Sequence, residues 1–125
     1  MSMLQLRRME REFHKVGEIC QKIKEDLHRI SITRNAVQEV ANIKGDELLS
    51  PLAEGMYIQT QCISDTVHVN IGAGVIAEKS VVQATDLLDL HAKRLHDQLA
   101  KQEQMQQDIS ATILKTIEKE NVREA

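Results

Sequence analysis

The chain is almost without aromatic residues: it has one Phe, one Tyr and no Trp, 2% of 125 residues. Because large rings supply much of the buried area of compact cores, a conventional globular core is not expected. Pro occurs once and Gly five times, which excludes loop-rich and collagen-like chains. The two cysteines, Cys20 and Cys62, form no Cys-x-x-Cys spacing. This pattern excludes a disulfide scaffold and is typical of a reducing, cytoplasmic environment.

A large charge of one sign and long apolar runs are also missing. Sixteen basic residues face nineteen acidic ones, so the formal net charge is -3. That near-balance argues against a protein that binds nucleic acid through phosphate contacts and against a polybasic membrane anchor. The apolar runs are too short for a transmembrane helix. No apolar stretch follows Arg7 and Arg8, so no secretory signal is expected.

What the sequence does contain is a regular apolar repeat in its first third. Ten of eleven positions spaced alternately by three and four residues are apolar, where composition predicts about five. Only Arg34 is polar among them. A seam of this kind is the signature of a coiled coil. Ser2 with Gln5 has capping-box spacing, and Lys44 followed by Gly45 predicts a helix end, so we expect one helix over residues 3–43. The seam positions are Leu6, Met9, Phe13, Val16, Cys20, Ile23, Leu27, Ile30, Arg34, Val37 and Ala41.

The last third of the chain repeats this spacing. Ser80 with Gln83 forms a second capping-box pattern, and neither Pro nor Gly follows it, so a helix is expected over residues 81–121. A second register through His91, Gln98 and Met105 overlaps the main seam, and the spacing alone does not exclude it. Two helices of similar length joined by a short segment favour an antiparallel hairpin. The main seam runs through Thr85, Leu88, Ala92, Leu95, Leu99, Gln102, Gln106, Ile109, Ile113 and Thr116.

Between the helices, residues 46–79 change from a helical period to the two-residue period of strands. Four short strands, with Pro51 near the end of the first and a turn at Ser64-Asp65, predict two β-hairpins. Isolated hairpins are marginal in water, and their open edges invite pairing with other chains. We therefore expect an obligate oligomer assembled through the hairpins. The residues expected at that interface are Leu49, Leu52, Met56, Ile58, Val67, Val69, Ile71 and Val75.

This middle segment resembles the alpha-class prefoldin subunits, most closely the branch of eukaryotic subunit five. The resemblance lies in a leucine-rich strand with proline, a Met-Tyr strand, a Gly-x-Gly turn and Glu-Lys-Ser before the last helix. It covers about residues 47–90, and the flanking helices agree in length and type. The matching residues are Leu48-Leu49-Ser50-Pro51-Leu52, Met56-Tyr57-Ile58, Val67 to Gly74 and Glu78-Lys79-Ser80.

The resemblance implies a single prefoldin-like domain over residues 1–125, of class α+β. It would be a long antiparallel α-helical coiled-coil hairpin whose two inserted β-hairpins join an oligomeric β-barrel. It further implies a hetero-hexamer of two alpha-class and four beta-class subunits in the cytoplasm. Such a hexamer is a holdase: without ATP, it binds unfolded polypeptides at the coiled-coil tips and delivers them to a group II chaperonin.

The ends of the predicted helices are unusually rich in Met and aliphatic residues, which suits binding of varied partners. Leu4 and Leu114 lie off the seams and are expected to face water. Leu6, Met9, Phe13, Ile109 and Ile113 are equally consistent with ordinary seam residues near a fraying end. The candidate client-binding residues at the tips are Met3, Leu4, Leu6, Met9, Phe13, Ile109, Ile113, Leu114 and Ile117.

No catalytic, metal or cofactor site is expected. Gly72-Ala73-Gly74 lacks the residues that a phosphate-binding loop needs and is better explained as a hairpin turn. The five histidines and two cysteines offer neither convergent metal ligands nor a nucleophile with a base. A second hypothesis remains, a prefoldin-like adaptor in a regulatory or transcription-linked complex. An RNA-binding helical arm is weaker, because acidic residues interrupt the basic ones near Arg7, Arg8 and Arg11.

Overall fold

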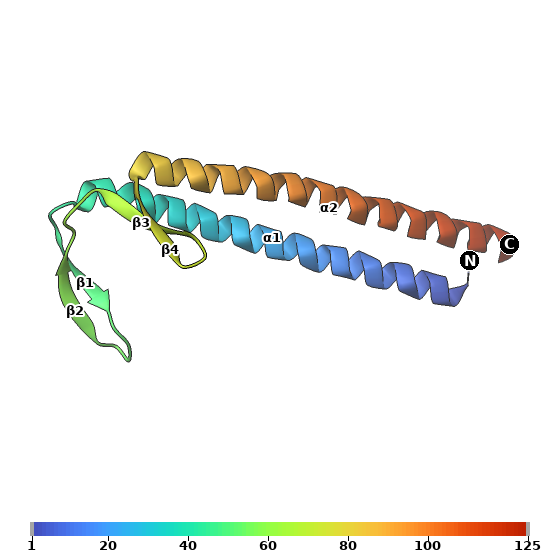
Figure 1. The fold of residues 1–125 in the computed structure, drawn as a ribbon. Helices are drawn as coiled ribbons and strands as arrows, with labels where there is room; N and C mark the ends of the chain where they lie inside the picture. Colours follow the sequence, from blue (N-terminus) through green and yellow to red (C-terminus); the bar gives the residue numbers. More distant parts are fainter. Residues whose placement is uncertain (1, 125) are drawn as a thin grey trace. The chain divides into compact units, whose positions relative to one another are not determined.

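The computed structural model describes residues 2–124 and consists of two long helices with four short strands between them (Figure 1). The chain divides into two compact units. One, the terminal unit, comprises residues up to 28 and from 92 on, and the other, the hairpin unit, comprises residues 29–91. The elements are α1 (Met3–Ile43), β1 (Glu47–Pro51), β2 (Tyr57–Gln61), β3 (Thr66–Gly72), β4 (Val75–Ser80) and α2 (Val81–Glu124).

Both helices begin at the capping boxes that the sequence predicts. Ser2 N donates to Gln5 Oε1 at 3.1 Å, and Gln5 N donates back to Ser2 Oγ at 3.2 Å. The same reciprocal pair joins Ser80 and Gln83, at 3.0 and 3.1 Å. Each box satisfies two backbone donors that a helix start would otherwise leave free. Because Ser80 is also the last residue of β4, α2 follows the hairpin without a loop.

Helix α1 ends where expected, although by glycine geometry and not by charge. Gly45 has φ of 90°, the left-handed conformation that only glycine adopts at little cost. Its amide donates to Cys62 O at 2.7 Å, and Cys62 N donates to Asp46 O at 3.0 Å, so the helix end is tied to the segment after β2. The last turn of α1 contains no basic residue, since Lys44 lies one position beyond it.

The heptad seams are the least exposed faces of both helices. Val16, Cys20 and Ile23 of α1 are buried, and Leu95 of α2 is buried. All ten positions of the main α2 seam are buried or half-buried, whereas His91, Gln98 and Met105 of the overlapping register are exposed. The main seam is therefore the correct one. On α1 only Ala41, the last position, is exposed.

The four strands form two separate antiparallel hairpins, and the described part of the chain contains no closed barrel. In β1–β2, Leu49 lies opposite Gln59 and Pro51 opposite Tyr57. Met56 and Leu52, which we expected within strands, lie in the connection between β1 and β2.

The β3–β4 hairpin contains a bulge that alters the expected alternation of its side chains. Val69 lies opposite Ala77, but the register shifts between Asn70 and Gly72. Val67, Val69 and Ile71 alternate with polar residues, and this alternation predicts that all three lie on the inward face of the strand. Val67 and Val69 are half-buried, whereas Ile71 is exposed. A bulge leaves one residue unpaired and redirects its side chain, so the prediction that Ile71 points inward is wrong for the single chain.

Candidate functional site

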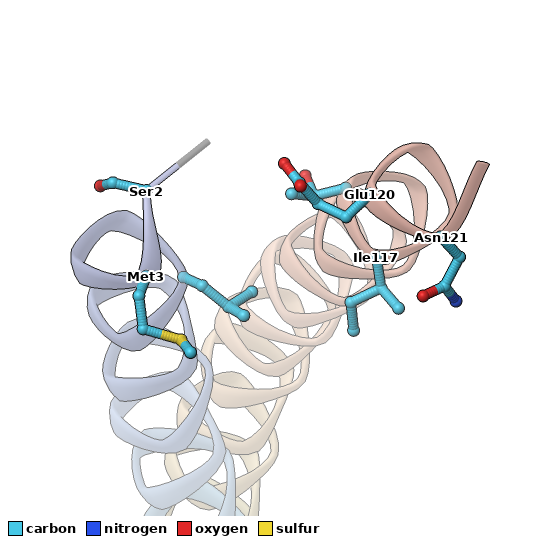
Figure 2. Close-up of a pocket in the computed structure, with 7 residues that line it drawn as sticks. Ser2, Met3, Ile117, Glu120 and Asn121 are labelled. Atoms are coloured by element: carbon cyan, nitrogen blue, oxygen red, sulfur yellow. The ribbon is translucent and has the colours of Figure 1, made fainter. Parts of the chain in front are cut away.

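In the terminal unit, a hollow of about 300 Å³ lies between the first turn of α1 and the last turns of α2 (Figure 2). Met3, on α1, is 68% exposed, and Leu4 beside it is 63% exposed. Figure 2 shows Met3 on one helix and Ile117 on the other, with Glu120 and Asn121 on the same helix as Ile117. The hollow is lined by Ser2, Met3, Leu6, Thr116, Ile117, Glu120 and Asn121.

A second hollow of about 420 Å³ lies further along the same unit, beside Phe13. Its other residues come from α2, and Leu114 among them is exposed. Short side chains on α2, Ser110 and Ala111, leave the space open. All of its lining residues are uncharged: Phe13, Gln106, Gln107, Ser110, Ala111 and Leu114.

The nine residues proposed for client binding thus separate into two groups. Four are exposed on the helix surfaces, and we name them the helix-end surface: Met3, Leu4, Leu114 and Ile117. The other five are half-buried seam residues, namely Leu6, Met9, Phe13, Ile109 and Ile113. Leu6 and Phe13 still reach the hollows. Sequence reasoning missed the polar lining residues because it searched only for apolar positions, although Thr116 and Gln106 are on the seam.

The eight residues proposed for oligomerisation also separate. Leu49, Leu52, Met56, Ile58, Ile71 and Val75 are exposed. Val67 and Val69 instead help to enclose a hollow of about 290 Å³ within the hairpin unit, with Val37 of α1 and Leu88 of α2. Three apolar residues of the strands and their connections that are at least 60% exposed were missed: Tyr57 at 60%, Ile63 at 86% and Ile76 at 64%. Tyr57 and Ile76 are next to predicted interface residues in the sequence, and Ile63 lies beside the turn at Ser64-Asp65.

Polar contacts tie the strands of each hairpin together. In β1–β2, the hydroxyls of Ser50 and Thr60 lie 2.8 Å apart, and Gln59 Nε2 donates to Glu47 Oε2 at 2.7 Å. In β3–β4, Thr66 Oγ1 donates to Glu78 Oε1 at 2.8 Å. These cross-strand pairs hold each hairpin in register. Most apolar side chains of the hairpins are exposed, whereas Val67 and Val69 are half-buried.

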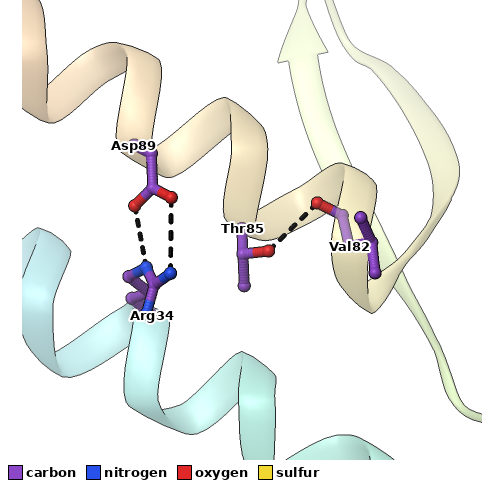
Figure 3. A network of polar contacts seen from close by, with 4 residues as sticks. All are labelled: Arg34, Val82, Thr85 and Asp89. Carbon is purple, nitrogen blue, oxygen red and sulfur yellow. Dashed lines mark hydrogen bonds and ion pairs between the residues drawn. The ribbon is translucent and has the colours of Figure 1, made fainter.

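The two helices of the hairpin unit are joined by an ion pair at a seam position (Figure 3). Arg34 Nε donates to Asp89 Oδ1 at 2.7 Å, and a terminal nitrogen of Arg34 donates to Asp89 Oδ2 at 3.3 Å. The hydrogen bond to Asp89 and the charge of that carboxylate raise the pKa of Arg34, with a smaller contribution from Asp86. The neighbouring Thr85 donates to Val82 O at 3.0 Å.

No group of three or more His, Cys, Asp or Glu side chains within the described residues could hold a metal ion. Cys20 is buried on the α1 seam, and Cys62 Sγ donates to Ser64 O at 3.2 Å. Neither helix, over the residues searched, is long and apolar enough to cross a membrane. The helix-end surface can therefore make apolar contacts, and the two hairpins can pair with further strands at their edges.

Two long helices in coiled-coil contact, with two β-hairpins between them and apolar side chains exposed at the helix ends, define a hairpin-bearing coiled-coil protein. The chain belongs to the prefoldin family: the family model described as "Prefoldin subunit" matches residues 6–123. This is a chaperone-type, non-enzymatic family. Comparison with curated proteins gives no match.

Among solved structures, the chain is similar to filamentous PFD from Methanocaldococcus jannaschii, determined by cryo-EM. The two share 16% sequence identity with a TM-score of 0.78. The alignment covers 90% of this chain and 95% of the archaeal one. At this identity the match shows a common fold.

Proposed function

We propose that the chain is an alpha-class prefoldin subunit in a cytoplasmic hetero-hexamer, two alpha-class with four beta-class subunits. The hexamer binds unfolded polypeptides without ATP and passes them to a group II chaperonin. The family match supports a prefoldin subunit. Four strands in two hairpins, in the order expected for the alpha class, support that assignment.

The client-binding surface is the helix-end surface, together with the two hollows beside it. Met3, Leu4, Leu114 and Ile117 expose apolar area next to hollows of about 300 and 420 Å³. Unfolded chains expose apolar side chains, which gain free energy when they leave water. Methionine adapts its shape to varied partners, and weak contacts from several subunits add through multivalency. This exposure of apolar side chains at the helix ends is the observation that carries the proposal.

Assembly uses the strands that the single chain leaves unpaired at their edges. Each hairpin has only two strands, and Leu49 on β1 is 71% exposed. Strands contributed by beta-class subunits extend both sheets, cover these apolar side chains and close the barrel. The cost of exposing them in water favours the oligomer.

A client-protection assay tests the proposal. Chemically denatured client is diluted into buffer with the assembled protein, and light scattering reports its aggregation. The variant replaces Met3, Leu114 and Ile117 by Ser. The matched control replaces Ile32 by Ser, because Ile32 is also an exposed aliphatic residue of α1 but belongs to the hairpin unit.

We expect the wild-type assembly and the Ile32→Ser control to suppress scattering and the triple variant to lose most of that effect. A wild-type assembly that never protects a client would favour the adaptor role. Equal protection by the triple variant would mean that clients bind elsewhere on the assembly.

A further inference from the structure

Arg34 occupies a position of the α1 seam where an apolar residue is the rule. Its seam neighbours, Ile30 and Val37, are aliphatic and half-buried. Its guanidinium donates two hydrogen bonds to the carboxylate of Asp89 on α2 (Figure 3). The nitrogen–oxygen distances are 2.7 and 3.3 Å. A fork of this kind needs a carboxylate at one particular height along the partner helix.

The aliphatic seam does not by itself define that height. A seven-residue slip of one helix along the other again brings most of the apolar seam residues opposite apolar residues, because the seam repeats with this period. The α2 seam has polar residues at Thr85, Gln102, Gln106 and Thr116 only. Such a slip moves the helices by about 10 Å, the rise of seven helical residues. The aliphatic contacts of the seam therefore discriminate weakly between the observed register and its slipped alternatives.

Arg34 does discriminate between these alternatives. Asp89 directly follows the seam residue Leu88, on the flank that faces Arg34. The residues at the equivalent flank position, seven earlier and seven later, are Val82 and His96. Neither offers a carboxylate, so a slip in either direction costs Arg34 its partner.

We propose that the Arg34–Asp89 pair is a register lock: it selects the pairing of α1 with α2 that seats the β3–β4 hairpin. The seat is the hollow under β3, to which α1 contributes Thr33 and Val37 and α2 contributes Ala84 and Leu88. A seven-residue slip would carry Val37 about 10 Å away from Leu88. Val67 and Val69 of β3 would then lose their common apolar floor. A polar residue at one seam position is a known way to specify register, at some cost in stability.

The test measures the register directly. Spin labels are attached to cysteines introduced at the exposed positions Asn42 and Leu90, in a background with Cys20→Ala and Cys62→Ser. Pulsed dipolar spectroscopy of the assembled protein, diluted with unlabelled copies, gives the distance distribution within one chain. The lock is removed by Arg34→Leu with Asp89→Leu, which places apolar side chains at both positions.

Two further variants complete the experiment. The charge-exchanged pair Arg34→Glu with Asp89→Arg keeps opposite charges at the two positions. The control Lys24→Leu with Glu103→Leu removes another pair between the helices, which is wider at 3.9 Å and does not involve a seam position.

We expect one narrow distance for the wild type, the control and the charge-exchanged pair. The double leucine variant should remain helical and melt no earlier, yet show a second component, its axial label separation changed by about 10 Å. A single wild-type distance in the double leucine variant would overturn the proposal. Loss of helicity in that variant would also overturn it, because a lock of register, unlike a stabilising contact, is dispensable for folding.

Discussion

The side-chain amide of Gln106 on α2 lies against the bare backbone of Gly17 on α1, so that a Cβ atom at residue 17 would stand 2.8 Å from Gln106 Nε2. Both residues belong to the terminal unit, and Gly17 lies within α1 with an ordinary helical φ. Glycine inside a helix costs about 0.5–1 kcal/mol relative to alanine. Because Gly17 has no side chain, the α2 seam can hold the polar Gln106 at a position where coiled coils usually pack an aliphatic residue.

Gly17→Ala should therefore stabilise the protein. The new methyl group meets only the end of a flexible amide, which can move, so most of the helix-propensity gain of about 0.5–1 kcal/mol should remain. Urea unfolding of the assembled protein measures the change. The double variant with Gln106→Ser removes the close contact and serves as the control. A loss of stability on Gly17→Ala that Gln106→Ser does not relieve would contradict this account.

Ser80→Ala should lower the stability of the protein more than Ser2→Ala, although each variant removes the same kind of capping hydrogen bond. Loss of a serine cap costs about 0.5–2 kcal/mol. Ser80 joins β4 directly to α2, so its cap holds a strand and a helix together, whereas Ser2 caps only the start of α1. Thermal unfolding of the two variants compares them. Equal losses would show that the junction between β4 and α2 depends on its cap no more than the start of α1 does.

Val69→Asp should abolish assembly while most of the helical circular dichroism signal remains. The carboxylate would enter the apolar hollow shared with Val37 and Leu88, where a charge without a partner is strongly unfavourable. The matched control is Asn70→Asp, next in β3 and exposed. Asn70 Oδ1 accepts from Gly72 N at 2.9 Å, a hydrogen bond that a carboxylate keeps. An oligomer that survives Val69→Asp would show that this face of β3 is unnecessary for assembly.

Removing residues 1–13 together with 109–125 should preserve assembly and abolish client protection. The truncation deletes Met3, Leu4, Leu114 and Ile117 and leaves the seam from Val16 onward. Since several weak contacts must act together, losing the surface removes the multivalent gain as well as local affinity. Light scattering of a denatured client, with the native mass of the truncated assembly measured in parallel, is the test. A truncated hexamer that protects equally well would place the client elsewhere.

The isolated chain should not persist as a folded monomer at micromolar concentration. Two-stranded sheets are marginal on their own, and side chains such as Leu49 and Ile63 are largely exposed. Analytical ultracentrifugation should show self-association, and addition of a beta-class partner should convert the chain into a hexamer. A compact monomer that melts cooperatively would contradict the proposed obligate assembly.

Local patterns predicted the helices and their starts, because those depend on residues close in the sequence. Ser2 with Gln5 and Ser80 with Gln83 form both hydrogen bonds of a capping box, as their spacing indicates. The three-and-four spacing of apolar residues identified the buried stripe of each helix, since helical geometry alone puts those positions on one face. The exposed apolar side chains at the helix ends were predictable for the same reason: Leu4 and Leu114 lie off that stripe.

Contacts between residues distant in sequence required the tertiary structure. The spacing marked Arg34 as an exception on the seam but did not identify Asp89 as its partner, fifty-five residues away. It did not reveal the bulge that turns Ile71 outward, because a bulge depends on how β3 and β4 align. Nor did it reveal that Val67 and Val69 pack within their own chain. The sequence by itself determined which faces are apolar, through the fixed periods of helix and strand. Only the tertiary structure decided which faces meet, because many pairings bury similar apolar area and side-chain shape and polar partners select among them.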